Sequence, residues 1–258
     1  MKDGFTHQFA VVTGAAQGIG RAIAEHLHRC GAQLLLVDCN AAVLHETTQA
    51  LRGQQGQAID CLVADLANPA AIRDLAAHIA HRQGRVNVLV NNAGIEVDLP
   101  LEKVTLEVFD RVIAVNLRAP LLLTQVLAPL FSEAGGAVVN ISSIHANHAF
   151  PNAIPYACSK AGLVALTRNL ALELAPRRIR VNAICPGYID TPMWDKWLRT
   201  VSDPEKAGRE AEALHPLGRR GRPEDVAKAV AFLASAQSDW VTGTCLVVDG
   251  GLTIRAHP

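Results

Sequence analysis

Three side chains between residues 140 and 161 have the types and spacing of an acid/base site. Ser143 closes an apolar run, Tyr156 follows thirteen residues later, and Lys160 comes four residues after the tyrosine. Residues four apart share one face of a helix, so we expect the Lys160 ammonium one turn from the Tyr156 phenol. A nearby positive charge favours phenolate and lowers a pKa that is ordinarily about 10. The segment therefore predicts a tyrosine that exchanges a proton near neutral pH, with Ser143 hydrogen-bonded to the same substrate oxygen.

A tyrosine and a lysine at this spacing also occur by chance on helices, and short motifs carry a high false-positive risk. The chain contains only two tyrosines, Tyr156 and Tyr188, which argues against a chance placement. The functional interpretation depends on the elements that would position the segment.

Short apolar runs alternate with amphipathic stretches along the chain. The runs predict strands over residues 9–13, 33–37, 58–63, 87–90, 137–141, 180–184 and 245–248, and the stretches predict helices over 21–30, 41–52, 68–81, 105–116, 120–131 and 223–234. Apolar strands that alternate with helices are typical of a parallel sheet covered on both faces. The predicted fold class is α/β, a single-domain Rossmann-like doubly wound sheet over residues 1–258, with a substrate lid over about 188–216.

The residues of chemical interest gather at the ends of these predicted strands. They are Gly14, Asp38, Asp65, Asn91, Ser143 and Pro186. Because ligands of such sheets bind at the carboxyl ends of the strands, we expect these residues to share one site.

A glycine-rich turn between the first strand and the first helix indicates a dinucleotide. Gly14, Gly18 and Gly20 permit a tight turn and let the backbone approach a pyrophosphate at the helix N-terminus. The second strand ends in Asp38, whose carboxylate can accept both ribose hydroxyls and would repel a 2′-phosphate. The pattern favours NAD over NADP. Two alternatives stay open: Asp38 as a turn or cap residue, and Arg21 as a phosphate contact.

Composition argues against several classes of partner. Lys plus Arg and Asp plus Glu both count 24, so the formal net charge is zero, which disfavours nucleic acid and membrane surfaces. We find no leader pattern and no apolar run of about eighteen residues, and expect a cytoplasmic protein. The six cysteines form no C-x-x-C pair, so we expect reduced thiols, no metal site and no disulfide framework.

Ordered motifs over nearly the whole chain resemble the short-chain dehydrogenase/reductase family. They are T-G-A-A-Q-G-I-G (Thr13–Gly20), D-L at Asp65, N-N-A-G (Asn91–Gly94), V-N-L around Asn116, I-S-S (Ile141–Ser143), Y-A-C-S-K (Tyr156–Lys160), R-V-N (Arg180–Asn182), P-G (Pro186-Gly187) with Thr191, and V-D-G-G (Val248–Gly251). The three-residue gap between Gly14 and Gly18 is similar to the alcohol-dehydrogenase branch of that family.

The resemblance implies a catalytic tetrad of Asn116, Ser143, Tyr156 and Lys160. Tyr156 would be the acid/base, Ser143 would orient the substrate oxygen, Lys160 would bind the nicotinamide ribose, and Asn116 would hold a relay water. The implied cofactor residues are Gly14, Gln17, Gly18, Ile19, Gly20, Asp38, Asp65, Leu66, Asn92, Ala93, Gly94, Tyr156, Lys160, Pro186, Gly187, Ile189 and Thr191. Because the family is usually tetrameric, a homotetramer is also implied.

Substrate contacts are expected in the segments after Asn91–Gly94, Ser143 and Pro186-Gly187. The candidates are Glu96, His145, His148, Tyr188 and Trp194. Carboxylates such as Glu96 and the nearby Asp98 can accept hydrogen bonds from sugar hydroxyls, whereas a tryptophan can stack on a sugar or steroid or only pack a lid. The run T-P-M-W-D-K-W-L is similar to family members that oxidise aldoses such as L-fucose, one of them also described as a 17β-hydroxysteroid dehydrogenase; the loop I-H-A-N-H-A-F-P departs from them.

The sequence thus predicts an NAD-dependent oxidoreductase for a small-molecule secondary or hemiacetal alcohol, with a sugar or polyol favoured. One alternative is a ketoreductase on a hydroxysteroid or a 3-oxoacyl thioester; Asp38 and the zero net charge disfavour the thioester reductases, which usually use NADP and a basic docking face. The alternative from another class is a non-catalytic NAD-binding sensor or scaffold, which the intact tetrad disfavours.

Overall fold

Seven parallel strands form one sheet in the computed structural model, which describes residues 4–53 and 57–255. The strand order is β3-β2-β1-β4-β5-β6-β7, and it reverses direction between β1 and β4. Each neighbouring pair is parallel. The strands are β1 (Phe9–Thr13), β2 (Gln33–Asp38), β3 (Ile59–Val63), β4 (Val88–Asn91), β5 (Gly136–Ile141), β6 (Ile179–Pro186) and β7 (Cys245–Val248). The predicted α/β class is confirmed.

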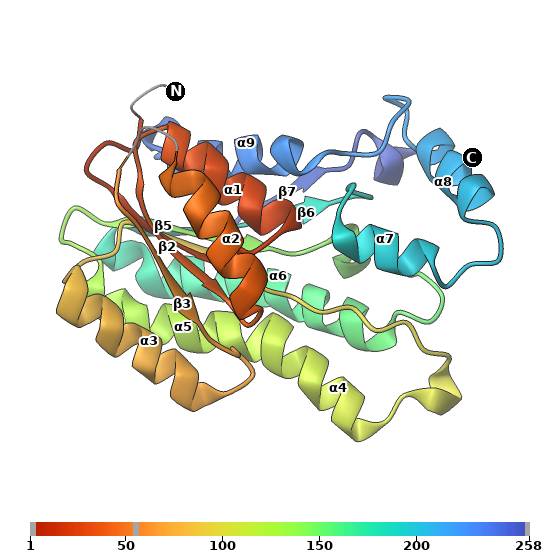
Figure 1. Ribbon diagram of the computed structural model, residues 1–258, viewed down its shortest axis with the longest axis horizontal. Helices are drawn as coiled ribbons and strands as arrows, with labels where there is room; N and C mark the ends of the chain where they lie inside the picture. Colours follow the sequence, from red (N-terminus) through yellow and green to blue (C-terminus); the bar gives the residue numbers. More distant parts are fainter. Residues whose placement is uncertain (1–3, 54–56, 256–258) are drawn as a thin grey trace.

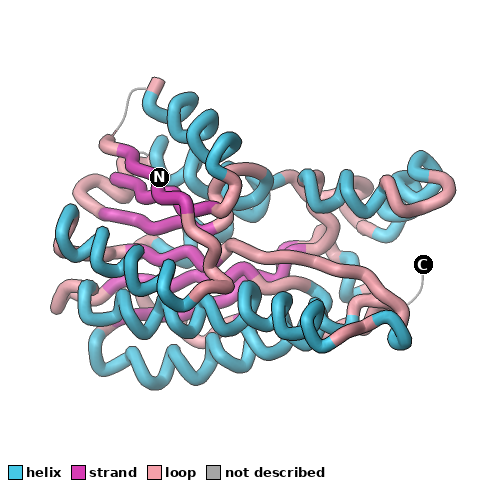
Figure 2. Tube along the Cα trace, turned by 60° about the horizontal axis from the view of Figure 1, so that its bottom comes forward, coloured by secondary structure: helices cyan, strands magenta, loops and turns pink. Residues whose placement is uncertain are grey.

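Helices cover both faces of the sheet, with α1, α2 and α9 on one face and α3 to α6 on the other (Figure 1). Figure 2 shows the strands lying between these two helical layers. The helices are α1 (Gly18–Arg29), α2 (Ala41–Arg52), α3 (Pro69–Arg82), α4 (Leu106–Ile113), α5 (Ala119–Leu127), α6 (Ile154–Leu174), α7 (Pro192–Leu198), α8 (Pro204–Leu214) and α9 (Pro223–Ala234).

Alternating side chains of each strand build two separate cores. In β1, Ala10 and Val12 join the cluster under α1 and α9, whereas Phe9 and Val11 join the cluster on the opposite face. Successive residues of a strand point to opposite faces, so a strand buried on both sides must be apolar at every position. These two cores hold the sheet rigid and thereby fix the positions of the strand ends.

Two helix boundaries differ from the sequence-based expectation. The first helix begins at Gly18 rather than Arg21, because Gln17 is extended and the glycine turn itself enters the helix. The helices predicted over 105–116 and 120–131 are joined by a π-helical turn at Ala114–Arg118, so helical structure runs from Leu106 to Leu130. Among the described residues, this stretch alone is long and apolar enough to span a membrane; 56% of its apolar window is buried, and it packs against α3 and α6.

The expected lid is a pair of short helices beyond the carboxyl ends of the strands (Figure 1). Thr191 caps α7 and Asp203 caps α8 through their side chains, and Pro192 and Pro204 occupy the first turns of these helices. Proline in a first turn lacks only an N–H that the helix would not use. The two caps therefore divide the segment expected to form the lid into two helices, α7 and α8.

Candidate active site

A cavity of about 960 Å³ opens at the carboxyl ends of the strands, spanning the point where the strand order reverses. Its volume lies near the upper end of the range for ligand sites, roughly 300–1,000 Å³. It is lined by residues from the glycine-rich turn, from the segments after β2 to β6 and from α7. Five of the six strand-end residues singled out in the sequence line this wall. The exception is Asn91, which is buried in the sheet and donates to Asn140 at 2.8 Å.

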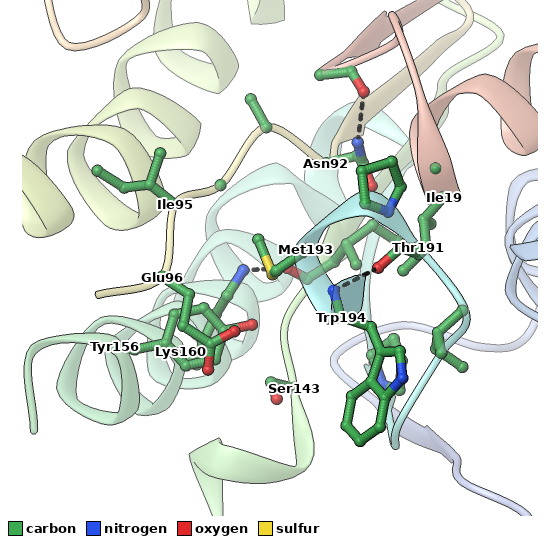
Figure 3. Close-up of a pocket in the computed structure, with 18 of the residues that line it drawn as sticks. Ile19, Asn92, Ile95, Glu96, Ser143, Tyr156, Lys160, Thr191, Met193 and Trp194 are labelled. Carbon is green, nitrogen blue, oxygen red and sulfur yellow. Dashed lines mark hydrogen bonds between the residues drawn. The ribbon is translucent and has the colours of Figure 1, made fainter. Parts of the chain in front are cut away.

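Ser143, Tyr156 and Lys160 lie together on this wall, between the end of β5 and the first turns of α6 (Figure 3). The Lys160 Nζ atom donates to the carbonyl oxygen of Ile141 at 2.8 Å and lies 5.4 Å from the centroid of the Tyr156 ring. Both Ser142 and Ser143 line the cavity, but the Ser142 hydroxyl already donates its proton to the Lys160 carbonyl at 2.9 Å. The hydroxyl chosen from the sequence is therefore the one available to a ligand.

The protonation of Tyr156 differs from the expectation that Lys160 lowers its pKa. Burial raises the pKa of Tyr156 above its ordinary value, and the charge of Glu96 raises it further, while hydrogen bonding to Ser143 opposes both. Burial also lowers the pKa of Lys160 to about 8. The expectation was wrong for the chain by itself, because the ammonium is directed to a main-chain carbonyl and the phenol is withdrawn from water.

Asn116 lies in the π-helical turn, behind the wall and not on it. Its amide donates to the Ile95 carbonyl and accepts from the Ile95 N–H, both at 2.9 Å, and it also donates to Ser159 at 3.0 Å. A π-helical turn inside a longer helix often marks a functional position. Asn116 thus clamps the chain just after β4 where it passes Lys160, and a Cβ atom on the intervening Gly94 would lie 3.4 Å from the lysine Nζ.

The glycine-rich turn leaves the start of α1 open to a ligand. Gly14 and Gly18 have φ values of +62° and +55°, which side-chain-bearing residues rarely adopt. No side chain caps α1 at Gln17, in contrast to α2 and α3, where Asn40 and Asn68 accept from main-chain N–H groups. Uncapped N–H groups at a helix N-terminus suit an anionic ligand such as a phosphate.

Asp38 and Asp65 face the cavity from the ends of β2 and β3. Asp38 accepts from the N–H groups of Ala16 at 3.0 Å and Asn40 at 2.9 Å. Asp65 pairs with Arg111 at 3.0 Å, and this hydrogen bond holds the pKa of Asp65 below its ordinary value. Both side chains are therefore held in place on the cavity wall by their hydrogen bonds. The hydrogen bonds from Ala16 and Asn40 are also those expected if Asp38 serves as a turn or helix-cap residue, the alternative raised from the sequence.

Arg21, the basic residue considered for a phosphate, is directed away from this wall. It pairs with Glu25 one helical turn later, with an Nε–Oε1 distance of 2.8 Å. The cavity lining does not include it.

Two carboxyls follow β4 on the opposite side of the cavity. Glu96 is partly buried and lies beside Tyr156 and Lys160 (Figure 3). Burial raises the pKa of Glu96 to about 7, and the charge of Asp98 adds to this effect. Asp98 is exposed at the rim of the cavity, and desolvation raises its pKa as well. Glu96 is thus a carboxyl that can be neutral near physiological pH.

Aromatic rings cover the remaining wall. His145 stacks on Phe150 with ring centroids 4.1 Å apart and meets the Tyr156 ring edge at 5.2 Å. Tyr188 lies 5.3 Å from Trp194. Burial lowers the pKa of His145 to about 4, so its imidazole is neutral. The cavity lining contains both tyrosines and two of the three tryptophans of the chain.

His148, the other histidine candidate, is exposed and does not line the cavity. The short 3₁₀ turn at Ile144–Ala146 turns the chain outward, because the His148 N–H donates back to Ile144 at 3.0 Å. The structure places only His145 at the site.

A model of the enoyl-(acyl carrier protein) reductase group within the short-chain dehydrogenases matches residues 14–253. The chain belongs to the short-chain dehydrogenase/reductase family. It is 39% identical to a 3-oxoacyl-(acyl-carrier-protein) reductase of Thermotoga maritima, covering 95% of this chain and 97% of that one. It is 40% identical to 3beta-hydroxysteroid dehydrogenase 1 of Eggerthella lenta, covering 98% and 97%.

Solved structures of the family extend the range of substrates. L-sorbose reductase from Gluconobacter frateurii, complexed with NADPH and L-sorbose, superposes with a TM-score of 0.93 at 29% identity, covering 98% of each chain. Oxidoreduction between a hydroxyl and a carbonyl is thus common to these relatives, and the L-sorbose reductase structure holds NADPH, whereas the substrates differ.

Several wall residues of this family member were not predicted from the sequence. Arg111 reaches the cavity from α4, 46 residues after its partner Asp65, and nothing in the local sequence links the two. Phe150, Met193 and Trp197 also line the cavity. The sequence signal that could have identified these three residues was their position in the loop after Ser143 or in the segment expected to form the lid.

Proposed function

We propose that this chain is an NAD-dependent dehydrogenase that acts on a secondary or hemiacetal hydroxyl of a sugar or polyol. The observation that carries this proposal is Glu96, a partly buried carboxyl beside Tyr156 and Lys160. A carboxyl near the reacting hydroxyl suits a substrate that carries a further hydroxyl close by, because a carboxylate only accepts hydrogen bonds and a neutral carboxyl can also donate one. The structural similarity to L-sorbose reductase supports the same substrate class.

The residues of the cavity fit a nicotinamide dinucleotide. The uncapped start of α1 would hold the pyrophosphate, and Asp38 would accept the hydroxyls of the adenosine ribose. Asp65 and Leu66 would lie against the adenine, Asn92 to Gly94 along the cofactor, and Pro186 to Thr191 at the nicotinamide end. When bound, such a cofactor accepts or supplies the hydride and, in its oxidised form, carries a positive charge.

The protein's part of the chemistry is to hold a proton at the phenol oxygen of Tyr156. Since burial and Glu96 raise the pKa of Tyr156, the chain by itself keeps the phenol protonated. The protonated phenol can donate its proton to a substrate carbonyl during reduction. For alcohol oxidation, the phenol must first lose this proton so that the phenolate can accept one from the substrate hydroxyl. Ser143 would hydrogen-bond the same oxygen, and Lys160 would bind a ribose hydroxyl and stabilise the phenolate. Asn116 would position the segment after β4 and a water of the proton relay.

We infer a preference for NAD from Asp38, whose carboxylate would accept the ribose hydroxyls and repel a 2′-phosphate bound to the same ribose. Arg21 is paired with Glu25, and Arg111 is paired with Asp65, so each has an acidic partner. A phosphate there would face the negative charge of Asp38 at close range.

A hydroxysteroid is the second candidate substrate, favoured by the aromatic wall of Phe150, Tyr188 and Trp194. A flat apolar alcohol would bury more surface against these rings than a sugar would. The similarity to 3beta-hydroxysteroid dehydrogenase 1 supports it.

A substrate panel distinguishes the two. Purified enzyme is assayed for NADH and NADPH formation with aldoses, polyols, hydroxysteroids and hydroxyacyl thioesters, and for the reverse reaction with the corresponding carbonyls. We expect the highest kcat/KM with a sugar or polyol and NAD. A higher value with a steroid or a thioester would contradict the substrate class. Cofactor binding without turnover of any alcohol would contradict an enzymatic function.

A further inference from the structure

Two cysteines on neighbouring strands lie in contact beside the candidate active site. The Sγ atoms of Cys185 in β6 and Cys245 in β7 are 2.7 Å apart. Cys245 pairs with Ala183 in the strand register, and Ala183 and Cys185 point to the same face of the sheet because they are two residues apart. Because Cys185 itself pairs with Val247, the two cysteines are diagonal neighbours on one face of the sheet, and their side chains meet although they are 60 residues apart in sequence.

Cys185 also contacts the strand end that carries Ser143. Its sulfur is hydrogen-bonded to Cys245, to the Ser142 side chain and to the main chain of Ser143. These hydrogen bonds, the one with Cys245 first, lower the pKa of the Cys185 thiol despite its burial. After the effects of burial and of Glu96, a negative charge on Cys185 raises the pKa of both Tyr156 and Lys160. The cysteine pair is thus coupled to the site through hydrogen bonds and through charge.

We propose that Cys185 and Cys245 form a modification site, a dithiol that hydrogen peroxide converts to a disulfide, and that this disulfide slows the oxidoreductase reaction. Cys185 is fully buried and Cys245 is partly exposed, so the oxidant reaches the pair from the side of β7. Sulfur atoms at 2.7 Å need only a small further approach to reach a bond of about 2.05 Å.

The reaction balances with one peroxide. The Cys185 thiol loses its proton, and the resulting thiolate attacks one peroxide oxygen. The O–O bond breaks, the sulfur becomes a sulfenic acid, and the departing hydroxide takes up the thiol proton as a water molecule. The Cys245 thiol then attacks this sulfur, the S–O bond breaks, and the departing hydroxide takes up the thiol proton as a second water molecule. Two thiols lose two electrons and the peroxide gains them, so no further reactant is needed.

Formation of the disulfide would change the contacts that the Cys185 sulfur makes with Ser142 and Ser143. Once bonded to Cys245, the Cys185 sulfur carries no negative charge and is drawn away from the hydrogen bonds with Ser142 and Ser143. The loss of one hydrogen bond at a positioned group lowers a rate by roughly twofold to tenfold. We expect a decrease of kcat in this range, with cofactor binding unchanged because the pair does not line the cavity.

The test treats the assembled enzyme with hydrogen peroxide, quenches it in acid, alkylates the remaining thiols and maps the peptides by mass spectrometry. We expect a linked Cys185–Cys245 peptide, a lower kcat and recovery with dithiothreitol. Cys245→Ser should form no linked peptide and should accumulate a sulfenic acid at Cys185 that a dione reagent traps. Cys158→Ser, which removes an exposed thiol of α6, is the matched control and should behave as the parent does.

Two results would overturn the proposal. One is that the thiols of Cys185 and Cys245 can both still be alkylated at a peroxide dose that has already oxidised the exposed Cys158. The other is a linked peptide formed in full without any change of kcat. Because the peptide map requires no substrate, a failure of the proposed sugar chemistry would be recognised separately in the substrate panel.

Discussion

The two sides of the cavity differ in how their polar groups are satisfied. On the side of β1 to β3, the charged groups have partners within the chain: Asp38 accepts from Ala16 and Asn40, and Asp65 is paired with Arg111. Apart from the uncapped start of α1, the polar groups named here are paired before any ligand arrives. Binding there costs little reorganisation, since the donors and acceptors already have fixed directions.

On the side of β4 to β6 and the lid, buried polar groups lack such partners. On this side, three buried nitrogen atoms have no hydrogen-bond partner among the described residues: His145 Nδ1, Trp194 Nε1 and His215 Nε2. Glu96 is held there with a raised pKa. A buried group without a partner costs free energy that a suitable ligand can recover. Polar groups are therefore satisfied within the chain mainly on the side that we propose for the cofactor, and least on the side that we propose for the substrate.

The largest expected effect is on Tyr156, which we propose as the group that exchanges a proton with the substrate. Tyr156→Phe should lower kcat by roughly 10²–10⁴-fold, the usual contribution of a general acid or base, and should leave cofactor affinity within about twofold. Steady-state kinetics and a fluorescence titration with NADH measure the two quantities. Tyr188→Phe removes the only other tyrosine and should lose far less activity. Equal losses in the two variants would refute the role of Tyr156.

The next effect tests the cofactor side. Asp38→Ala removes the charge that would repel a 2′-phosphate, so the ratio of kcat/KM with NAD to that with NADP should fall by roughly tenfold or more. Asp190→Ala, which removes an exposed carboxylate paired with Arg220, is the control and should not change the ratio. An unchanged ratio in Asp38→Ala would mean that this carboxylate serves only to cap its own turn.

Glu96→Ala tests the substrate side through selectivity. Losing a hydrogen bond to a charged group costs about 1.5–3 kcal/mol, so kcat/KM for a polyol should fall by roughly 10- to 100-fold. A simple secondary alcohol without a further hydroxyl should lose much less. A loss of the same size for both substrates would show that Glu96 acts on the reacting groups and not on substrate recognition.

The smallest expected effect is that of Glu96→Gln on the free energy of unfolding. The pKa of Glu96 rises from 4.5 to about 7 on folding, so the folded chain binds more protons than the unfolded one between these pH values. Stability is therefore lost as pH rises through this window, and the full penalty is present above about pH 7. Glu96→Gln removes a penalty of roughly 1–3 kcal/mol after allowance for solvent screening.

We accordingly expect Glu96→Gln to raise Tm by several degrees at pH 8 and by little at pH 4.5. Thermal unfolding followed by circular dichroism at the two pH values measures this change. Glu102→Gln, an exposed carboxylate of the following segment, should change Tm little at either value. An equal increase at both pH values would contradict the raised pKa.

The sequence by itself determined the fold and the cofactor side of the cavity. A strand buried on both faces must be apolar at each position, and glycine is needed where φ is positive, so β1, Gly14 and Gly18 are recognisable locally. The alternation of such strands with helices then places Asp38, Asp65 and Ser143 at one edge of the sheet. Local patterns suffice there because each depends on backbone geometry that few residue types allow.

Only the tertiary structure decided the electrostatics and the substrate side. The sequence placed Lys160 one helical turn from Tyr156, but the carbonyl of Ile141 receives its ammonium, and burial sets both pKa values. Arg111 meets Asp65, and Cys185 meets Cys245, across separations for which the sequence carries no periodic signal. Desolvation and contact between distant segments depend on how the layers pack, and that packing is a property of the whole chain.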